Sequence, residues 1–164
     1  MRKLLTAATV MLTALILISC SNIGTSPSGK EIPIEKASIK LVADVKDGGY
    51  QLISAEELNK WMTEKKDMII IDSMPKEDFA KTHIKGAVNS PFPRTEKELT
   101  PTEKENVVKV AGADKNKIIV IYCGFTACRR SHFGAKTLVE NGYKNIYRYP
   151  GGIISWKENK FPLE

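Results

Sequence analysis

The chain has 164 residues, of which 42% are hydrophobic and 27% are charged, a composition that suits one globular domain with its own core. Its formal net charge of +6 comes from Lys and Arg residues that are interleaved with Asp and Glu along most of the chain. Because the sequence has no basic stripe with interleaved aromatic residues, we do not expect nucleic acid as a partner.

The first 20 residues differ from the rest of the chain. Arg2 and Lys3 precede an apolar run over residues 4–18, which has the pattern of a secretory signal and is too short for a comfortable membrane span. The run ends in Leu17-Ile18-Ser19-Cys20, which resembles the bacterial lipoprotein box, where a small residue precedes a lipidated Cys. We therefore expect residues 1–19 to be a lipoprotein signal peptide and Cys20 to carry the lipid. The alternatives are an uncleaved anchor, or an ordinary signal in which Cys20 is incidental.

Cleavage before Cys20 predicts an exported lipoprotein that is anchored in a membrane and faces the periplasm. Because Ser21, and not Asp, follows the Cys, the destination would be the outer membrane if the host has one. Residues 21–29 are rich in Ser, Gly and Pro, so we expect residues 20–47 to hold the lipidated Cys and a flexible tether. Within this segment, residues 30–46 could add an edge strand or remain extended.

From residue 48 onward, strand and helix patterns alternate along the chain. Strands are expected at residues 50–53, 68–71, 87–89, 118–122 and 145–149. Helices are expected at residues 55–65, 75–80, 101–111 and 130–140, followed by a last short helix that contains Trp156. Ser54 is the expected N-cap of the first helix, and Glu57 would complete a capping box with it. The alternation predicts one α/β domain over residues 48–164, with a mostly parallel central sheet flanked by helices on both faces.

The strongest local feature is the apolar run at residues 118–122, which is followed directly by Cys123, a polar loop and a helix. A buried parallel strand would deliver Cys123 to its C-terminal end, where ligands bind in open α/β sheets. The N-terminal amides of the helix, together with Arg129 and Arg130, would favour a thiolate, which is the nucleophilic form of Cys. The same amides could bind an anionic substrate or a persulfide. The alternative interpretation is a buried structural Cys at the end of a strand.

An ordered series of short motifs resembles the rhodanese-like domain family over roughly residues 48–164. The first half of the series contains Ile70-Ile71-Asp72, Glu77-Asp78-Phe79 and His83-Ile84-Lys85-Gly86-Ala87-Val88-Asn89. The second half contains Tyr122-Cys123, Arg130-Ser131, Asn141-Gly142-Tyr143, Gly151-Gly152-Ile153 with Trp156, and a closing Pro162. The resemblance implies a rhodanese-like fold and an enzyme that transfers sulfur.

In that chemistry, the Cys123 thiolate would attack the sulfane sulfur of thiosulfate, polysulfide or a protein persulfide, and would then pass the sulfur to a thiol or to cyanide. The implied partners are therefore a small sulfur-containing anion or a protein thiol or persulfide, and the reaction needs no metal or organic cofactor. The implied substrate-binding residues form the loop after the nucleophile, namely Gly124, Phe125, Thr126, Ala127, Cys128, Arg129 and Arg130. Asp72 and Ser131 are expected to support the site.

Two departures from the family pattern leave other functions open. Met74 stands where the family usually has an Arg, which predicts that a supporting ion pair is missing. The family usually places an Arg five positions after the Cys, whereas Arg129 is six positions after Cys123 and Arg130 is seven. The spacing Cys123-x5-Arg129 also satisfies a phosphatase pattern, so an enzyme like a phosphatase or an arsenate reductase is an alternative.

Cys128 adds a third possibility, a non-enzymatic redox or sulfur-carrier module that uses Cys123 and Cys128. An exported protein meets an oxidising compartment, where two thiols on one loop can pair in a disulfide. Cys128 could resolve a persulfide or sulfenate on Cys123, or could be a small apolar residue of the loop.

Overall fold

The computed structural model describes residues 31–164. The expected signal peptide at residues 1–19, the lipid on Cys20 and the first part of the tether therefore lie outside the described residues. Contacts divide the chain after Lys36, and the elements discussed below belong to the compact unit Ala37–Glu164, except for residues 31–36 at the start of the first helix.

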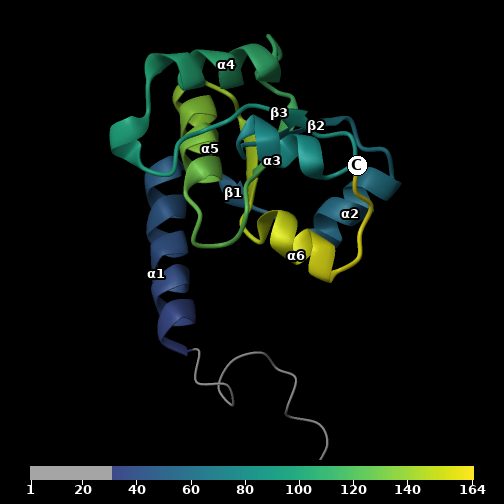
Figure 1. The fold of residues 1–164 in the computed structure, drawn as a ribbon. Helices are drawn as coiled ribbons and strands as arrows, with labels where there is room; N and C mark the ends of the chain where they lie inside the picture. Colours follow the sequence, from purple (N-terminus) through teal and green to yellow (C-terminus); the bar gives the residue numbers. More distant parts are fainter. Residues whose placement is uncertain (1–30) are drawn as a thin grey trace, which may run out of the picture. The chain divides into compact units, whose positions relative to one another are not determined.

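The centre of this unit is a five-stranded sheet in the order β1-β5-β4-β2-β3, and every pairing in it is parallel (Figure 1). The strands are β1 (Gln51–Leu52), β2 (Met68–Asp72), β3 (Val88–Asn89), β4 (Ile118–Tyr122) and β5 (Asn145–Tyr149). β4 lies in the middle, with Val120 opposite Ile70 of β2 and Tyr147 of β5. The expected parallel α/β fold is confirmed, and all five expected strands are present.

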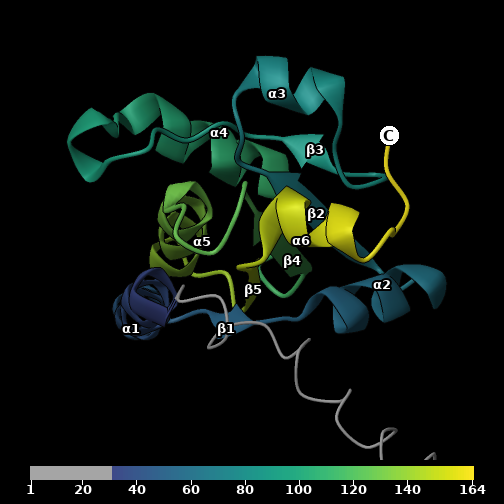
Figure 2. The same cartoon turned by 60° about the horizontal axis from the view of Figure 1, so that its bottom comes forward.

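Helices cover both faces of the sheet, as the views in Figures 1 and 2 agree. They are α1 (Glu31–Gly48), α2 (Ala55–Thr63), α3 (Lys76–Lys81), the short 3-10 helix η2 (Glu96–Glu98), α4 (Pro101–Ala111), α5 (Arg130–Glu140) and α6 (Gly152–Glu158). The helices α4 and α5 cover one face of the sheet, and α2 and α6 cover the other. Among the residues that the structure describes, no helix has the length and apolar character needed to cross a membrane.

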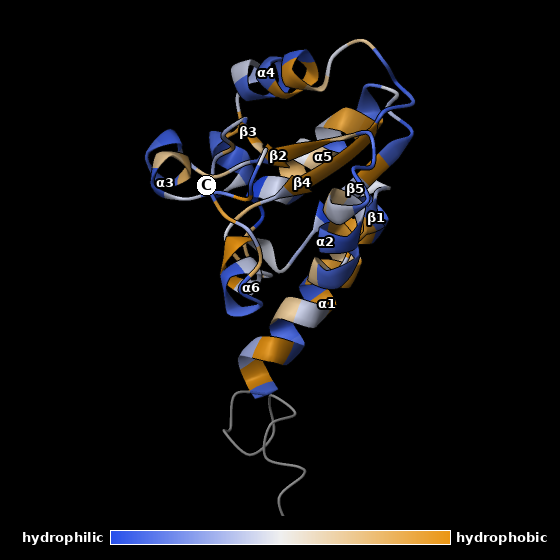
Figure 3. Ribbon diagram, turned by 90° about the vertical axis from the view of Figure 1, so that its right-hand side faces the viewer, coloured by the Kyte–Doolittle hydropathy of each residue, from blue (hydrophilic) through white to orange (hydrophobic). Residues whose placement is uncertain are grey.

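The hydrophobic core has two halves because side chains alternate along each strand. From β4, Ile119 and Ile121 pack on the side of α5, while Val120 and Tyr122 pack on the side of Trp156 in α6. The four residues of β4 from Ile119 to Tyr122 are fully buried, and Figure 3 shows hydrophobic character along β2 and β4. Continuous apolar runs are what strands covered on both faces require.

The start of α2 follows the expected cap only in part. The Ser54 hydroxyl accepts a hydrogen bond from the Glu57 backbone N–H at 3.1 Å, as predicted. The Glu57 carboxylate, however, accepts a hydrogen bond from the indole N–H of Trp61 instead of closing the capping box. Ser54 therefore satisfies one of the free amides at the helix start, and Glu57 ties the helix to a core residue.

The structure differs from expectation in the segment before the sheet, which forms the helix α1 and not an edge strand or an extended tether. The compact unit accordingly begins at Ala37, earlier than the predicted boundary at residue 48. Within this unit, Leu41, Asp44, Val45 and Gly48 lie on the covered side of α1, while Val42 is 70% exposed. A helical pattern was hard to detect because the two buried positions of this face carry an aspartate, Asp44, and a glycine, Gly48, instead of large apolar residues.

Candidate functional site

Cys123 lies directly after β4 and is fully buried. Its backbone carbonyl accepts a hydrogen bond from the Ile153 N–H at 2.9 Å, and the carbonyl of Gly124 accepts one from the Ile154 N–H at 3.1 Å, so the start of α6 packs on the backbone of Cys123 and Gly124. Gly152 makes this approach possible. Its φ is +60°, and a Cβ there would lie 2.3 Å from the Cys123 carbonyl oxygen.

Ser131 and Arg148 form a hydrogen-bonded chain that ends at the Cys123 sulfur. Cys123 Sγ lies 3.1 Å from Ser131 Oγ, and Arg148 Nε donates to the same Ser131 oxygen at 3.0 Å. Because a guanidinium can only donate, Ser131 accepts from Arg148, and its own hydroxyl hydrogen is free to point at Cys123 Sγ. This arrangement would stabilise negative charge on Cys123.

Arg148 is a fully buried charge that fastens the loop after β4 to the rest of the domain. Its guanidinium donates to Cys128 O at 2.8 Å, to Tyr50 Oη at 3.1 Å and to Asp44 Oδ2 at 3.3 Å. A buried charge is tolerated only when it is paired and hydrogen-bonded, and Asp44 of α1 provides the opposite charge. Sequence reasoning missed both residues, although an Arg between the apolar residues of β5 was a detectable signal.

The two loop cysteines are free thiols in different electrostatic surroundings. Burial raises the pKa of the Cys123 thiol well above its usual value, and the adjoining Cys128 raises it further. The pKa of Cys128 is lowered to about 5, first by the hydrogen bond from the Cys123 thiol and then by the backbone amides of Arg130 and Gly124. The amides that were expected to favour a thiolate at Cys123 therefore act on Cys128.

A cavity of about 410 Å³ opens beside the loop. Its lining residues are Met74, Asp78, Arg94, Gly124, Phe125, Cys128, Arg130, Ile153 and Ile154. Four of the seven predicted substrate-binding residues thus line this cavity, and two cationic side chains stand against one carboxylate, which suits a small anion. A smaller cavity of about 210 Å³ is lined by Cys128 together with Lys40, Arg94, Phe125, Ala127 and Arg129. Thr126 lines neither cavity, and its backbone carbonyl lies 3.5 Å from Nη2 of the buried Arg148.

The sequence profile of the rhodanese-like domain family matches residues 54–159. The chain belongs to the rhodanese-like domain family. The tRNA uridine(34) hydroxylase of Bdellovibrio bacteriovorus is 32% identical over 110 residues, which cover 67% of this chain and 29% of that protein. The enzyme of the same name from Yersinia pestis is 25% identical over 157 residues, which cover 87% of this chain and 42% of that protein. The chain thus spans roughly a third of the length of the curated relatives that it matches.

Solved structures share the rhodanese-like fold. Thiosulfate sulfurtransferase from Pseudomonas aeruginosa has a TM-score of 0.60 and 18% identity, and the match covers 78% of this chain and 22% of that one. The polysulfide-sulfur transferase homodimer from Wolinella succinogenes has a TM-score of 0.58 and 23% identity, with 85% and 93% of the two chains covered. At these identities the likeness concerns the fold alone.

Within this rhodanese-like domain, neither arginine of the loop reaches over Cys123. Arg129 donates from Nε to Asp44 Oδ1 at 3.1 Å, and its Nη1 lies 3.9 Å from Glu96. Arg130 donates from Nη1 to the Phe92 carbonyl and lines the larger cavity. The lengthened loop therefore uses Arg129 as a structural ion-pair partner of α1.

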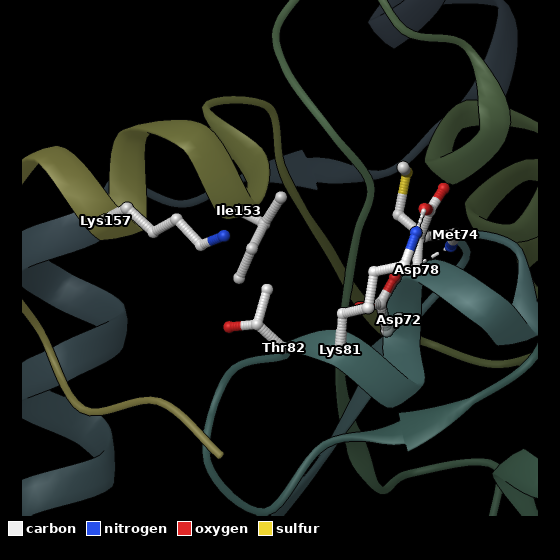
Figure 4. A pocket seen from close by; sticks show the side chains of 7 residues that line it. All are labelled: Asp72, Met74, Asp78, Lys81, Thr82, Ile153 and Lys157. Carbon is white, nitrogen blue, oxygen red and sulfur yellow. Dashed lines mark hydrogen bonds and ion pairs between the residues drawn. The ribbon is translucent and has the colours of Figure 1, made fainter.

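The loop after β2 forms the opposite wall of the site. Asp72 Oδ1 accepts a hydrogen bond from the Met74 backbone at 2.7 Å, and burial is the main cause that raises the Asp72 pKa. Met74 replaces the Arg usual in the family, and its side chain lies against Gly124, since a Cβ there would be 3.5 Å from Met74 Sδ. A neighbouring cavity of about 270 Å³ shares Met74, Asp78 and Ile153 with the larger one (Figure 4). In Figure 4, Lys157 reaches toward it from α6.

Proposed function

We propose that the chain is a sulfurtransferase that carries sulfane sulfur as a persulfide on Cys123. The observation that supports this function most strongly is the combination of family membership with a Cys at the C-terminal end of the central strand. The adjoining cavity, with Arg94 and Arg130 in its wall, suits an anionic donor such as thiosulfate or a polysulfide.

The reaction with thiosulfate balances without a cofactor. A Cys thiolate forms a bond to the sulfane sulfur, the S–S bond of thiosulfate breaks, and sulfite leaves with the electron pair. An acceptor thiolate or cyanide then attacks the outer sulfur of the persulfide, and the Cys leaves as a thiolate. The Ser131 hydroxyl, which Arg148 orients, would stabilise the negative charge that returns to Cys123.

The alternative of a phosphatase or an arsenate reductase is disfavoured by two contacts. The backbone carbonyl of Cys128 lies 3.3 Å from Cys123 Sγ, where a phosphate oxygen would be repelled. The Arg at the phosphatase position, Arg129, is bound to Asp44 and not directed over Cys123. An oxyanion held above Cys123 would therefore lack the donors that such chemistry needs. The tRNA hydroxylation named for the relatives is not proposed, because the chain spans only roughly a third of their length.

The sulfurtransferase function is tested with the purified, reduced full chain. We expect incubation with thiosulfate to leave a mass gain of one sulfur atom after the donor is removed, and cyanide to release that sulfur as thiocyanate. Cys123→Ser is expected to retain no sulfur once the donor is gone. A wild-type chain that shows neither the mass gain nor thiocyanate would rule out the function.

We further propose that the enzyme is exported and anchored by a lipid on Cys20, on the periplasmic side and in the outer membrane of a diderm host. The support is the sequence around Ser19 and Cys20. We expect the mass of the wild-type chain from the membrane fraction to correspond to residues 20–164 with an added lipid, and the same lipid to be present in Ser19→Ala, which keeps a small residue, and absent from Cys20→Ser. A wild-type chain that retains residues 1–19 and carries no lipid would instead support an uncleaved anchor.

A further inference from the structure

Cys123 and Cys128 differ in their access to a ligand. Cys123 is fully buried, whereas Cys128 is half-buried and lines both the cavity of about 410 Å³ and the cavity of about 210 Å³. Cys123 lines neither of these two cavities. A sulfur donor in the larger cavity would therefore contact Cys128, while Cys123 is buried beneath the loop.

The loop folds Cys128 back over Cys123. The Cys128 backbone N–H donates to the Phe125 carbonyl at 2.9 Å, which closes a turn, and the Cys128 carbonyl lies 3.3 Å from Cys123 Sγ. Arg148 holds that carbonyl from below at 2.8 Å. The two cysteines thus lie close together in one loop, and Cys128 lines the cavity while Cys123 is buried in the core.

We propose that Cys128 is the sulfur-receiving residue of this enzyme, and that it passes sulfane sulfur from a donor in the cavity to the buried Cys123. This inference rests on the proposed sulfurtransferase function and deepens it. Cys128 would then accept sulfur from the donor, and Cys123 would hold it as a persulfide.

The transfer balances without an oxidant or a reductant. The Cys128 thiolate takes the outer sulfur of thiosulfate or of a polysulfide, and sulfite or the shortened polysulfide leaves with the electron pair. The Cys123 thiol gives its proton to the Cys128 persulfide, and the resulting Cys123 thiolate attacks the outer sulfur. The bond between that sulfur and Cys128 Sγ breaks, Cys128 leaves as a thiolate, and the proton stays on the transferred sulfur.

The charges around the loop favour this direction of transfer. With its pKa lowered to about 5, Cys128 is a thiolate at neutral pH and a good leaving group. The raised pKa of Cys123 makes its thiolate the stronger nucleophile and the better holder of the sulfur.

Positive groups dominate the surroundings of Cys128. The charged side chains of the two cavities that it lines are Lys40, Arg94, Arg129, Arg130 and the single carboxylate Asp78. Lys40, Arg129 and the buried Arg148 all pair with the single carboxylate of Asp44, so Arg94 and Arg130 are the cations that an anionic donor in the larger cavity would contact.

The test compares sulfur loading in Cys128→Ser and Cys123→Ser full chains, quenched with an alkylating agent after brief exposure to polysulfide. We expect Cys128→Ser to load Cys123 at least about tenfold more slowly than the wild type does. Cys123→Ser is expected to carry sulfur on Cys128 while the donor is present and to lose it when the donor is removed. Thermal melting checks that both variants are folded.

The pH dependence of loading separates a receiving role from a structural one. The wild-type loading rate should be nearly flat from pH 6 to 8, because Cys128 is already ionised there. In Cys128→Ser the rate should rise about tenfold per pH unit, because the buried Cys123 must itself ionise. Loading of Cys128→Ser at the wild-type rate would overturn the relay and leave the proposed function intact. If neither the wild-type chain nor any variant takes up sulfur, the proposed function itself is overturned.

Discussion

The loop between β4 and α5 has a buried side, where charged side chains are paired, and an open side, where cationic side chains line a cavity. On its underside, Asp44, Arg148 and Ser131 are buried, and each charged or polar atom that contacts the loop has a partner. On its open side, Arg94 and Arg130 line a cavity beside the half-buried Cys128. The comparison indicates that the contacts on the underside fix the conformation of the loop, while the open side is accessible to a ligand.

The largest effect is expected from breaking the underside at Asp44. Asp44→Ala leaves Arg148 as a buried charge without its carboxylate, which should lower the free energy of unfolding by about 3–5 kcal/mol. Asp47→Ala is the matched control, because Asp47 is on the same helix and forms an exposed pair with Lys136 at 2.9 Å. That control should cost about 1 kcal/mol or less. Urea unfolding measures both, and equal losses would contradict a special role for the buried pair.

The next effect concerns the contact of α6 with the backbone of Cys123. Gly152→Ala places a Cβ against the backbone of Cys123 and Gly124 at a φ of +60°, so the loop or the helix must shift. We expect a loss of about 2–3 kcal/mol in unfolding free energy, together with slower sulfur loading. Gly142→Ala also has a positive φ but meets no atom within 4 Å, and should cost only about 1 kcal/mol. If the two variants behave alike, the close approach to Cys123 does not matter.

A smaller effect is expected from the hydrogen bond between Ser131 and Cys123. Ser131→Ala removes a hydrogen-bond donor that stabilises the Cys123 thiolate by about 1 kcal/mol. Because alkylation needs the thiolate, we expect Cys123 to be alkylated roughly fivefold more slowly. The measurement is best made in Cys128→Ser, where Cys123 is the only loop thiol, over a range of pH. Unchanged alkylation would show that the underside does not stabilise charge on Cys123.

A separate effect is a pH dependence of stability from the buried His132. Burial lowers its pKa from 6.5 to about 4, so the folded chain holds the ring neutral. Because the unfolded chain takes up the proton first, this stability is present above pH 6.5 and is lost as the pH falls from 6.5 to about 4. The urea midpoint should decline over this window in the wild type and decline less in His132→Asn. An equal decline in both chains would assign the effect to other groups.

The sheet and most helices could be predicted because they depend on local sequence signals, such as apolar runs for buried strands and capping residues for helices. Residues 118–122 are a continuous apolar run, and α4 and α5 begin and end where the sequence predicts. The helix α1 and the underside of the loop could not be predicted, because they depend on Asp44 and Arg148, which are 104 positions apart in the chain. A charged residue in a sequence indicates solvent exposure unless its distant partner is known.

The candidate site was predicted at the level of its loop and not of its individual side chains. The sequence placed Cys123 at the end of the central strand, and the structure does the same. It did not reveal that Cys123 is buried or that the amides of Gly124 and Arg130 act on Cys128, because these properties follow from how the lengthened loop folds back on itself.

The proposed relay is tested most directly by measuring the order in which sulfur reaches Cys128 and Cys123 in the wild-type chain. Samples quenched with an alkylating agent at successive times after mixing with polysulfide can be fragmented to place the added sulfur on Cys123 or Cys128. The account predicts that sulfur appears first on Cys128 and then declines there as it accumulates on Cys123. Sulfur that reaches Cys123 without delay, with Cys128 unlabelled throughout, would contradict it.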